Sequence, residues 1–191
     1  MKLLFHCCCG PCAAACIEDL VAENIQPRLF WYNPNIHPYT EYSSRRGALA
    51  QLVSAQNLEL DMIDEYGLRL FLRAIGCETE SAADNTHTAR CNVCYRMRLE
   101  RAAAHAAAEG FDAFSTSLLI SPYQNHDEIR RIGGELAAQY GVAFLYRDFR
   151  PRFREGQAQA RALGLYMQKY CGCIFSEEER YLKPKQRQEH P

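Results

Sequence analysis

The chain has 191 residues, of which 48% are hydrophobic and 24% are charged, a composition typical of a globular protein with a buried core. No apolar run approaches the ~20 residues that a membrane-crossing helix needs, which excludes a membrane-spanning protein. Lys and Arg total 22 against 23 for Asp and Glu, giving a formal net charge of −1. This balance argues against a protein held on nucleic acid by bulk charge alone.

Apolar runs and turn signals predict strands that alternate with helices along the whole chain. In chain order we expect a strand at 2–6, a helix at 12–23, a strand at 28–32, a helix at 41–56, a strand at 58–63, helices at 67–75 and 92–109, a strand at 114–118, a helix at 128–140, a strand at 143–146 and a helix at 155–163.

This alternation predicts an α/β fold, with a parallel sheet covered by helices on both faces. Such sheets bind ligands beyond the carboxyl ends of their strands, and the first strand leads into cysteines at that edge. We expect residues 64–110 to form a helical insertion or lid that carries Cys91 and Cys94 to the same edge. The chain is expected to form a single domain over residues 1–182, followed by a polar tail over residues 183–191.

The unusual feature of the composition is its ten cysteines, which are unevenly spread. Five crowd the start of the chain, four form two close pairs, and Cys77 stands alone. The first apolar stretch is too short for a secretory signal, so we expect a cytoplasmic protein whose thiols serve metals or redox chemistry. The grouped cysteines are Cys7, Cys8, Cys9, Cys12 and Cys16, then Cys91 with Cys94, and Cys171 with Cys173.

The first group lies on a strand-to-helix turn, where unpaired backbone N–H groups favour thiolates. Neighbouring Cys8 and Cys9 can both reach a polynuclear cluster, whereas adjacent cysteines are an unusual way to build a tetrahedral zinc site. This favours iron–sulfur chemistry, with Cys12 one turn further on. Strand alternation places Cys7 in the core, and Cys16 is expected to be buried and inert.

The two later pairs are weaker signals taken alone. Cys91 and Cys94 form a Cys-x-x-Cys at the start of a predicted helix, a spacing that zinc sites, redox pairs and clusters all use. Cys171 and Cys173 flank one glycine, so they can chelate one metal or close a strained, easily reduced disulfide.

Candidate substrate contacts come from loops that follow the second and fourth strands and from two arginine-rich stretches. Phe149 and Phe153 interleave the later stretch, a pattern that suits phosphate contact and stacking on an unpaired base, although such stretches are usually solvated faces. For the loop residues, the alternative is a plain loop without a binding role, and for His37 it is a surface or loop histidine. The candidates are Asn33, His37, Arg90, Arg96, Tyr123, Arg150 and Arg154.

Five motifs together resemble the QueH type of epoxyqueuosine reductase. They are residues 8–12 (CCGPC), 32–38 (YNPNIHP), 90–96 (RCNVCYR), 118–126 (LLISPYQNH) and 165–176 (LYMQKYCGCIFS). The resemblance implies a HUP-like fold, kin to adenine nucleotide α-hydrolases. It also implies that the protein reduces epoxyqueuosine to queuosine in the anticodon loop of tRNA without cobalamin.

The resemblance also implies a site. The positions of a 4Fe–4S cluster match Cys8, Cys9, Cys91 and Cys94. Cys171 and Cys173 match a pair that forms a redox-active disulfide or binds a second, single metal such as iron, and Cys12 is expected to face that metal. The expected catalytic residues are Cys12, Cys171, Cys173 and Tyr95, with the proton coming from Tyr95, Tyr170 or water.

Two other classes of function fit parts of the pattern. One is a non-catalytic zinc-binding structural protein, and the other is a thiol–disulfide oxidoreductase that uses Cys9 and Cys12. The reductase interpretation requires two partners, a tRNA and an electron donor whose identity the sequence leaves open, and it involves no membrane.

Overall fold

The computed structural model describes residues 1–76 and 89–182, and these form one α/β unit around a five-stranded parallel sheet. The strands are β1 (Leu3–His6), β2 (Pro27–Trp31), β3 (Leu60–Met62), β4 (Ala113–Thr116) and β5 (Ala143–Phe144). Their order across the sheet is β3-β2-β1-β4-β5, so β1 is central. Successive strands are added on one side of β1 as far as β3, and β4 and β5 are then added on its other side. Ligands of such sheets bind at this change of side, beyond the carboxyl ends of the strands.

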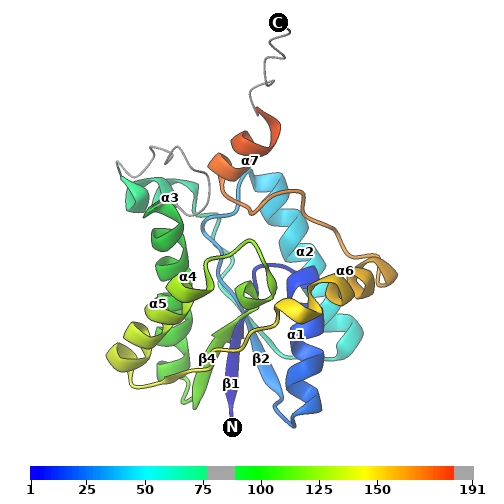
Figure 1. The fold of residues 1–191 in the computed structure, drawn as a ribbon, viewed down its shortest axis with the longest axis vertical. Coiled ribbons are helices and arrows are strands. Elements are labelled where there is room, and N and C mark those ends of the chain that lie inside the picture. Colours follow the sequence, from blue (N-terminus) through cyan, green and yellow to red (C-terminus); the bar gives the residue numbers. More distant parts are fainter. Residues whose placement is uncertain (77–88, 183–191) are drawn as a thin grey trace, which may run out of the picture.

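Helices cover both faces of the sheet, α1 and α2 on one and α4 and α5 on the other, while α6 packs beside α1 (Figure 1). The helices are α1 (Gly10–Ala22), α2 (Tyr39–Gln56), α3 (Leu68–Ile75), α4 (Ala89–Ala108), α5 (His126–Tyr140), α6 (Phe153–Ala162) and α7 (Ile174–Tyr181). The strands point toward the end of the molecule that carries α3 and α7, at the top of Figure 1.

The core lies between the sheet and its helices. All four residues of β1 are buried, as expected for a central parallel strand covered on both faces. On one face, Leu99 and Ala103 of α4 are fully buried, and this helix contacts β1 and β4. The helix that begins with the Cys-x-x-Cys pair therefore covers the sheet with its later turns and brings its first turn to the carboxyl edge.

Each strand and helix expected from the sequence has a counterpart, and the ends differ by at most three residues. The predicted strand at 114–118 ends early because the side chain of Thr116 caps a short 3-10 helix, η1 (Ser117–Ile120). Helix α7 was not predicted. Cys77 and the polar tail at 183–191 lie outside the described residues, so the predicted boundary at residue 182 stays a prediction.

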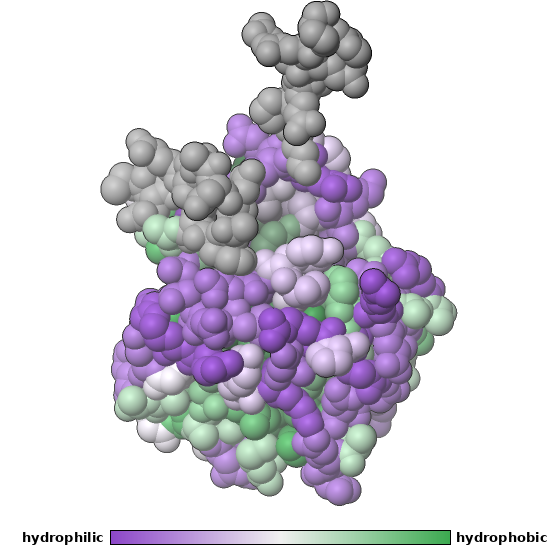
Figure 2. Space-filling model, viewed as in Figure 1, coloured by the Kyte–Doolittle hydropathy of each residue, from purple (hydrophilic) through white to green (hydrophobic). Residues whose placement is uncertain are grey.

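The distribution of hydrophilic and apolar residues on the surface is typical of a globular protein. Figure 2 shows that hydrophilic residues cover most of the visible face, with apolar residues gathering toward its lower part. Among the described helices, none combines the length and the apolar character needed to cross a membrane.

Candidate metal centre and adjoining cavity

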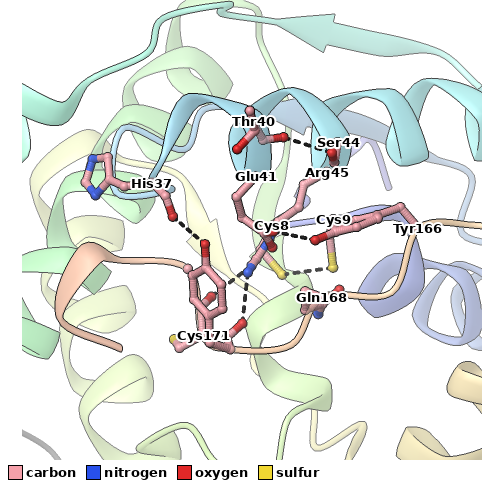
Figure 3. Close-up of polar contacts among 12 residues, drawn as sticks. Cys8, Cys9, His37, Thr40, Glu41, Ser44, Arg45, Tyr166, Gln168 and Cys171 are labelled. Carbon is pink, nitrogen blue, oxygen red and sulfur yellow. Dashed lines mark hydrogen bonds and ion pairs between the residues drawn. The ribbon is translucent and has the colours of Figure 1, made fainter. Parts of the chain in front are cut away.

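The turn between β1 and α1 gathers three thiols. The strand ends at His6, the helix begins at Gly10, and Cys9 lies at the N-cap. The sulfur atoms of Cys8, Cys9 and Cys12 all lie within 4.8 Å of one another. Those of Cys8 and Cys9 are 3.8 Å apart (Figure 3). Three sulfurs at this spacing form a donor set for a thiophilic metal.

This thiol group is buried and electrostatically asymmetric. Hydrogen bonds from Cys12, Cys9 and Ser117, with the positive charge of Arg98, hold the pKa of the Cys8 thiol well below its ordinary value. The Ser117 hydroxyl donates to the Cys8 sulfur at 3.4 Å. Burial raises the pKa of the Cys9 thiol. The thiolate form of Cys8 is thus stabilised at the carboxyl end of the central strand β1. The thiolate is the form of cysteine that binds metal.

A second sulfur group lies where α4 and α7 begin. Cys94, in the first turns of α4, packs with Cys173, the N-cap residue of α7, in a small buried cluster. Phe71 and Ile75 of α3 complete that cluster. Cys91 is partly buried one turn earlier on α4.

Arg98 connects the two sulfur groups. Its Nη2 donates to the Cys94 sulfur at 3.1 Å, and its Nε donates to the Cys94 carbonyl at 3.1 Å. The same positive charge acts on Cys94, Cys171 and Cys8. The Cys-x-x-Cys end of α4 therefore lies on the same side of the molecule as the β1–α1 turn, although the close thiol triad is Cys8, Cys9 and Cys12.

The segment that contains Cys171 is held by a buried arginine of α2 (Figure 3). Arg45 donates to the carbonyls of Tyr170 and Cys171, each at 2.8 Å. Its Nε also donates to Glu41 at 2.7 Å, and the hydroxyl of Tyr166 donates to the same carboxylate. The guanidinium thus fixes the path of the chain as it passes the thiols.

A cavity of about 270 Å³ opens beside the thiols. Sulfur atoms on its wall belong to residues from the β1–α1 turn and from the C-terminal segment. Glutamine amides, apolar side chains, hydroxyl groups and the charged side chains of Arg45 and Lys169 also line it. The lining includes Cys8, Pro11, Cys12, Leu118, Ile120, Tyr123, Gln124, Phe153, Gln157, Met167, Gln168, Lys169, Tyr170 and Cys171.

Two glutamines donate hydrogen bonds to sulfur in this wall. Gln168 Nε2 donates to Cys12 at 3.2 Å, and Gln124 Nε2 donates to Cys171 at 3.4 Å. Tyr95 does not line the cavity; its hydroxyl donates to Gln124 Oε1 at 2.8 Å. The catalytic candidate Tyr95 therefore contacts a residue of the cavity wall, Gln124, whose amide donates to Cys171.

Two of the substrate-binding candidates are buried beside the site and do not line the cavity. Asn33 is fully buried and donates to the Cys7 carbonyl at 2.9 Å. The buried His37 ring hydrogen-bonds the Pro34 carbonyl at 3.0 Å. Both side chains shape the loop after β2. Cys7 and Cys16 are fully buried, as expected.

The other candidates lie near the surface or in ion pairs. Three arginines pair with carboxylates: Arg90 with Glu179, Arg96 with Glu135, and Arg150 with Asp148. Arg154 is exposed. Tyr123 is 76% exposed at the cavity rim, and its ring meets Phe153 edge-on with 6.0 Å between centroids.

Sequence reasoning did not place Arg45, Gln124 or Gln168 at the site, and it counted Arg98 only as part of an arginine-rich stretch. A usable signal existed for Arg98, which follows Cys94 by four residues, one helical turn, and therefore shares its helix face. Arg45 follows Glu41 at the same spacing, which in a sequence is typical of an exposed ion pair. The glutamines carry no local signal because their partners are 47 and 156 residues away.

The sheet order and the thiol turn define the class: an α/β protein with cysteines at the carboxyl edge of its parallel sheet, as the sequence pattern predicted, and with the HUP-like fold that the resemblance implied. The fold resembles the crystal structure of a predicted subunit of tRNA methyltransferase from Methanocaldococcus jannaschii. The TM-score is 0.53, with 84% of this chain and 74% of that chain covered at 10% sequence identity. At this identity the likeness concerns the fold alone.

Sequence comparison identifies the family. The profile of the family described as epoxyqueuosine reductase QueH matches residues 3–179. The chain is 37% identical to the epoxyqueuosine reductase QueH of Dehalococcoides mccartyi, over 96% of each chain. Identity to the proteins of that name is 36% in Acinetobacter baylyi (92% of this chain, 80% of that one) and 34% in Thermotoga maritima (93% and 91%). The chain belongs to the epoxyqueuosine reductase QueH family, which confirms the resemblance found in its motifs.

Proposed function

We propose that this protein reduces the epoxide of epoxyqueuosine to the alkene of queuosine in the tRNA anticodon loop. Two electrons and two protons enter, both carbon–oxygen bonds of the epoxide break, and the oxygen leaves as water. The observation that carries the proposal is membership of the QueH family over residues 3–179. The thiol-lined cavity at the ligand-binding edge of the sheet supports it.

We infer that Cys8, Cys9, Cys91 and Cys94 hold a 4Fe–4S cluster. The donor chemistry fits an anionic, thiolate-ligated group, because Cys8 and Cys9 are neighbouring thiols at the β1–α1 turn and the nine described cysteines form no disulfide. The buried charge of Arg98 beside Cys94 fits the same group. When bound, the cluster supplies single electrons and Lewis acidity.

Cys12, Cys171 and Cys173 form the second part of the proposed centre, either as ligands of one further metal such as iron or as a redox-active disulfide between the last two. Cys12 and Cys171 line the cavity and each accepts a hydrogen bond from a glutamine. Cys173 accepts a hydrogen bond from the Ser176 backbone N–H at 3.4 Å. All three sulfurs therefore have a hydrogen-bond donor from the protein.

Protons reach the substrate from water in this account. The Tyr95 hydroxyl donates to Gln124, and the Tyr170 hydroxyl donates to the His37 carbonyl at 2.7 Å. Gln168 Oε1, in contrast, is buried and accepts no hydrogen bond from the described residues. This acceptor can hold a water molecule, or a polar hydrogen of the substrate, beside Cys12.

The rim of the cavity suits an unpaired nucleotide. The exposed ring of Tyr123, backed by Phe153, offers a stacking surface for a base, and Lys169 lines the same opening. Arg154, exposed on the neighbouring helix α6, is available for a phosphate. Because the net charge is −1, we expect the tRNA contact to be moderate in strength and sensitive to salt.

The test uses tRNA from cells that lack this activity, incubated with anaerobic protein and a chemical reductant. Nucleoside analysis should show loss of epoxyqueuosine and gain of queuosine. Y123A should raise KM more than it lowers kcat, whereas Y123F, which keeps the ring, should behave like the native protein. Retention of the epoxide with iron-loaded protein would refute the proposal. Colourless protein with one zinc would favour the structural alternative, and metal-free protein that reduces disulfides would favour the thiol oxidoreductase.

A further inference from the structure

Three arginines of the described chain are buried, and two of them have a carboxylate as partner. Arg45 pairs with Glu41, and Arg90 pairs with Glu179. Arg98 is 2% exposed and forms no ion pair with any carboxylate of the part of the chain that the structure describes. A buried guanidinium without an anion carries a large desolvation cost, and its positive charge cannot be removed by deprotonation.

Among the described residues, Arg98 donates a side-chain hydrogen bond to a sulfur atom. Its Nη2 lies 3.1 Å from the Cys94 sulfur, and its charge also acts on Cys171 and Cys8, which come from two other segments of the chain. The Tyr95 ring is 6.0 Å from its guanidinium carbon.

We propose that Arg98 is the buried counter-ion of the thiolate-ligated cluster, and that it raises the cluster's reduction potential and its affinity for iron. This inference rests on the proposed function. Thiolate ligands and the cluster together carry net negative charge, which increases when an electron enters. A fixed cation within hydrogen-bonding distance of one ligand sulfur therefore favours the reduced state, and it favours the assembled site over free thiols.

The position on α4 explains how the charge is held there. Arg98 lies one turn after Cys94, its Nε is tied to the carbonyl of the same residue, and the helix packs on the sheet through Leu99. The guanidinium thus cannot reach solvent without leaving the core. Arg101, three residues further on the same helix, is exposed. It offers a matched control because its removal changes the total charge equally but at a solvated site.

The test compares anaerobically reconstituted native protein with R98M, R98K and R101M. Spectroelectrochemical titration should give R98M a midpoint potential more negative than that of native protein, while R98K and R101M stay close to it. An unchanged potential in R98M, or an equal shift in R101M, would overturn the inference. Native protein that binds no iron would instead contradict the proposed function, so the two failures are distinguishable.

A second measurement covers a variant that fails to assemble the site. In metal-free, reduced protein the guanidinium has no carboxylate partner among the described residues, so R98M should unfold at the same urea concentration as native protein or a higher one. R98M that is stable without metal but takes up less iron than R98K supports the counter-ion role. R98M that is unfolded without metal, with R98K folded, would show that Arg98 serves the fold itself and would overturn the inference.

Discussion

Arg45 is the residue whose replacement should disturb the C-terminal segment most. R45M leaves the Glu41 carboxylate, 7% exposed, without its cation, and it leaves the carbonyls of Tyr170 and Cys171 without donors. Removing one partner of a buried ion pair costs about 3–5 kcal/mol. We expect R45M to lower the free energy of unfolding by that amount. R45K keeps a positive charge near Glu41 but cannot reach both carbonyls, and should cost about 1–2 kcal/mol.

The assay is urea denaturation of metal-free, reduced protein, so that metal binding does not contribute to the measured free energy. The double variant R45M/E41Q removes both charges and keeps an acceptor for the Tyr166 hydroxyl. It should therefore be destabilised by less than the sum of its two single variants. A cost below about 1 kcal/mol for R45M, or strict additivity in the double variant, would refute the reasoning.

Two further predictions concern the fold around the site. Burial lowers the pKa of His37 from 6.5 to about 4, and protonation would place a proton on Nδ1, which is buried with no partner among the described residues. The neutral ring therefore stabilises the folded protein fully above pH 6.5, and this contribution, at most about 3 kcal/mol, is lost as the pH falls toward 4. H37Q should lose this part of the acid sensitivity in unfolding measurements. An unchanged pH profile of unfolding in H37Q would contradict the prediction. In α5, G133A should destabilise the protein because the added Cβ would overlap the Phe144 ring. The neighbouring G134A has open space around the added Cβ and should raise the stability measured by thermal denaturation by up to about 1 kcal/mol. Equal effects of the two changes would contradict the close contact between Gly133 and Phe144.

The parts of the fold that were predictable are those with local signals. Alternating apolar strands and helices indicate the parallel sheet, and Gly10 before Pro11 marks the start of α1. From these two signals the carboxyl edge of β1 could be predicted as the location of Cys8, Cys9 and Cys12, and the structure confirms that location.

The parts that were missed depend on contacts between distant residues. Helix α7 is short and largely polar, and it is held by the pairing of Arg90 with Glu179 and by stacking of Arg90 on Phe175, 4.8 Å from the guanidinium carbon to the ring centroid. Arg152 likewise pairs with Glu18 and Asp19, more than 130 residues away. Long-range ion pairs leave no periodic pattern in a sequence, so arginines that the sequence offered as phosphate contacts are partly committed to the protein itself.

The site shows the same division. Spacing identified the cysteines, but the nearest sulfur neighbours are Cys8, Cys9 and Cys12, while Cys94 packs beside Cys173. The four proposed ligands can bind one group only if the start of α4 lies close to the β1–α1 turn. This contact joins segments that are far apart in the chain, so no local sequence pattern predicts it. The structure brings the two groups within the field of one buried arginine, Arg98.

The central claim is that thiols from the β1–α1 turn and from α4 hold one iron–sulfur cluster. The most direct measurement is iron content with the absorption spectrum of anaerobically reconstituted native protein, C91S/C94S and the buried-cysteine control C16S. Native protein and C16S should each bind about four irons or more per chain and absorb broadly near ~400 nm, while C91S/C94S should lose both properties. A full cluster in C91S/C94S, or colourless native protein, would contradict the account.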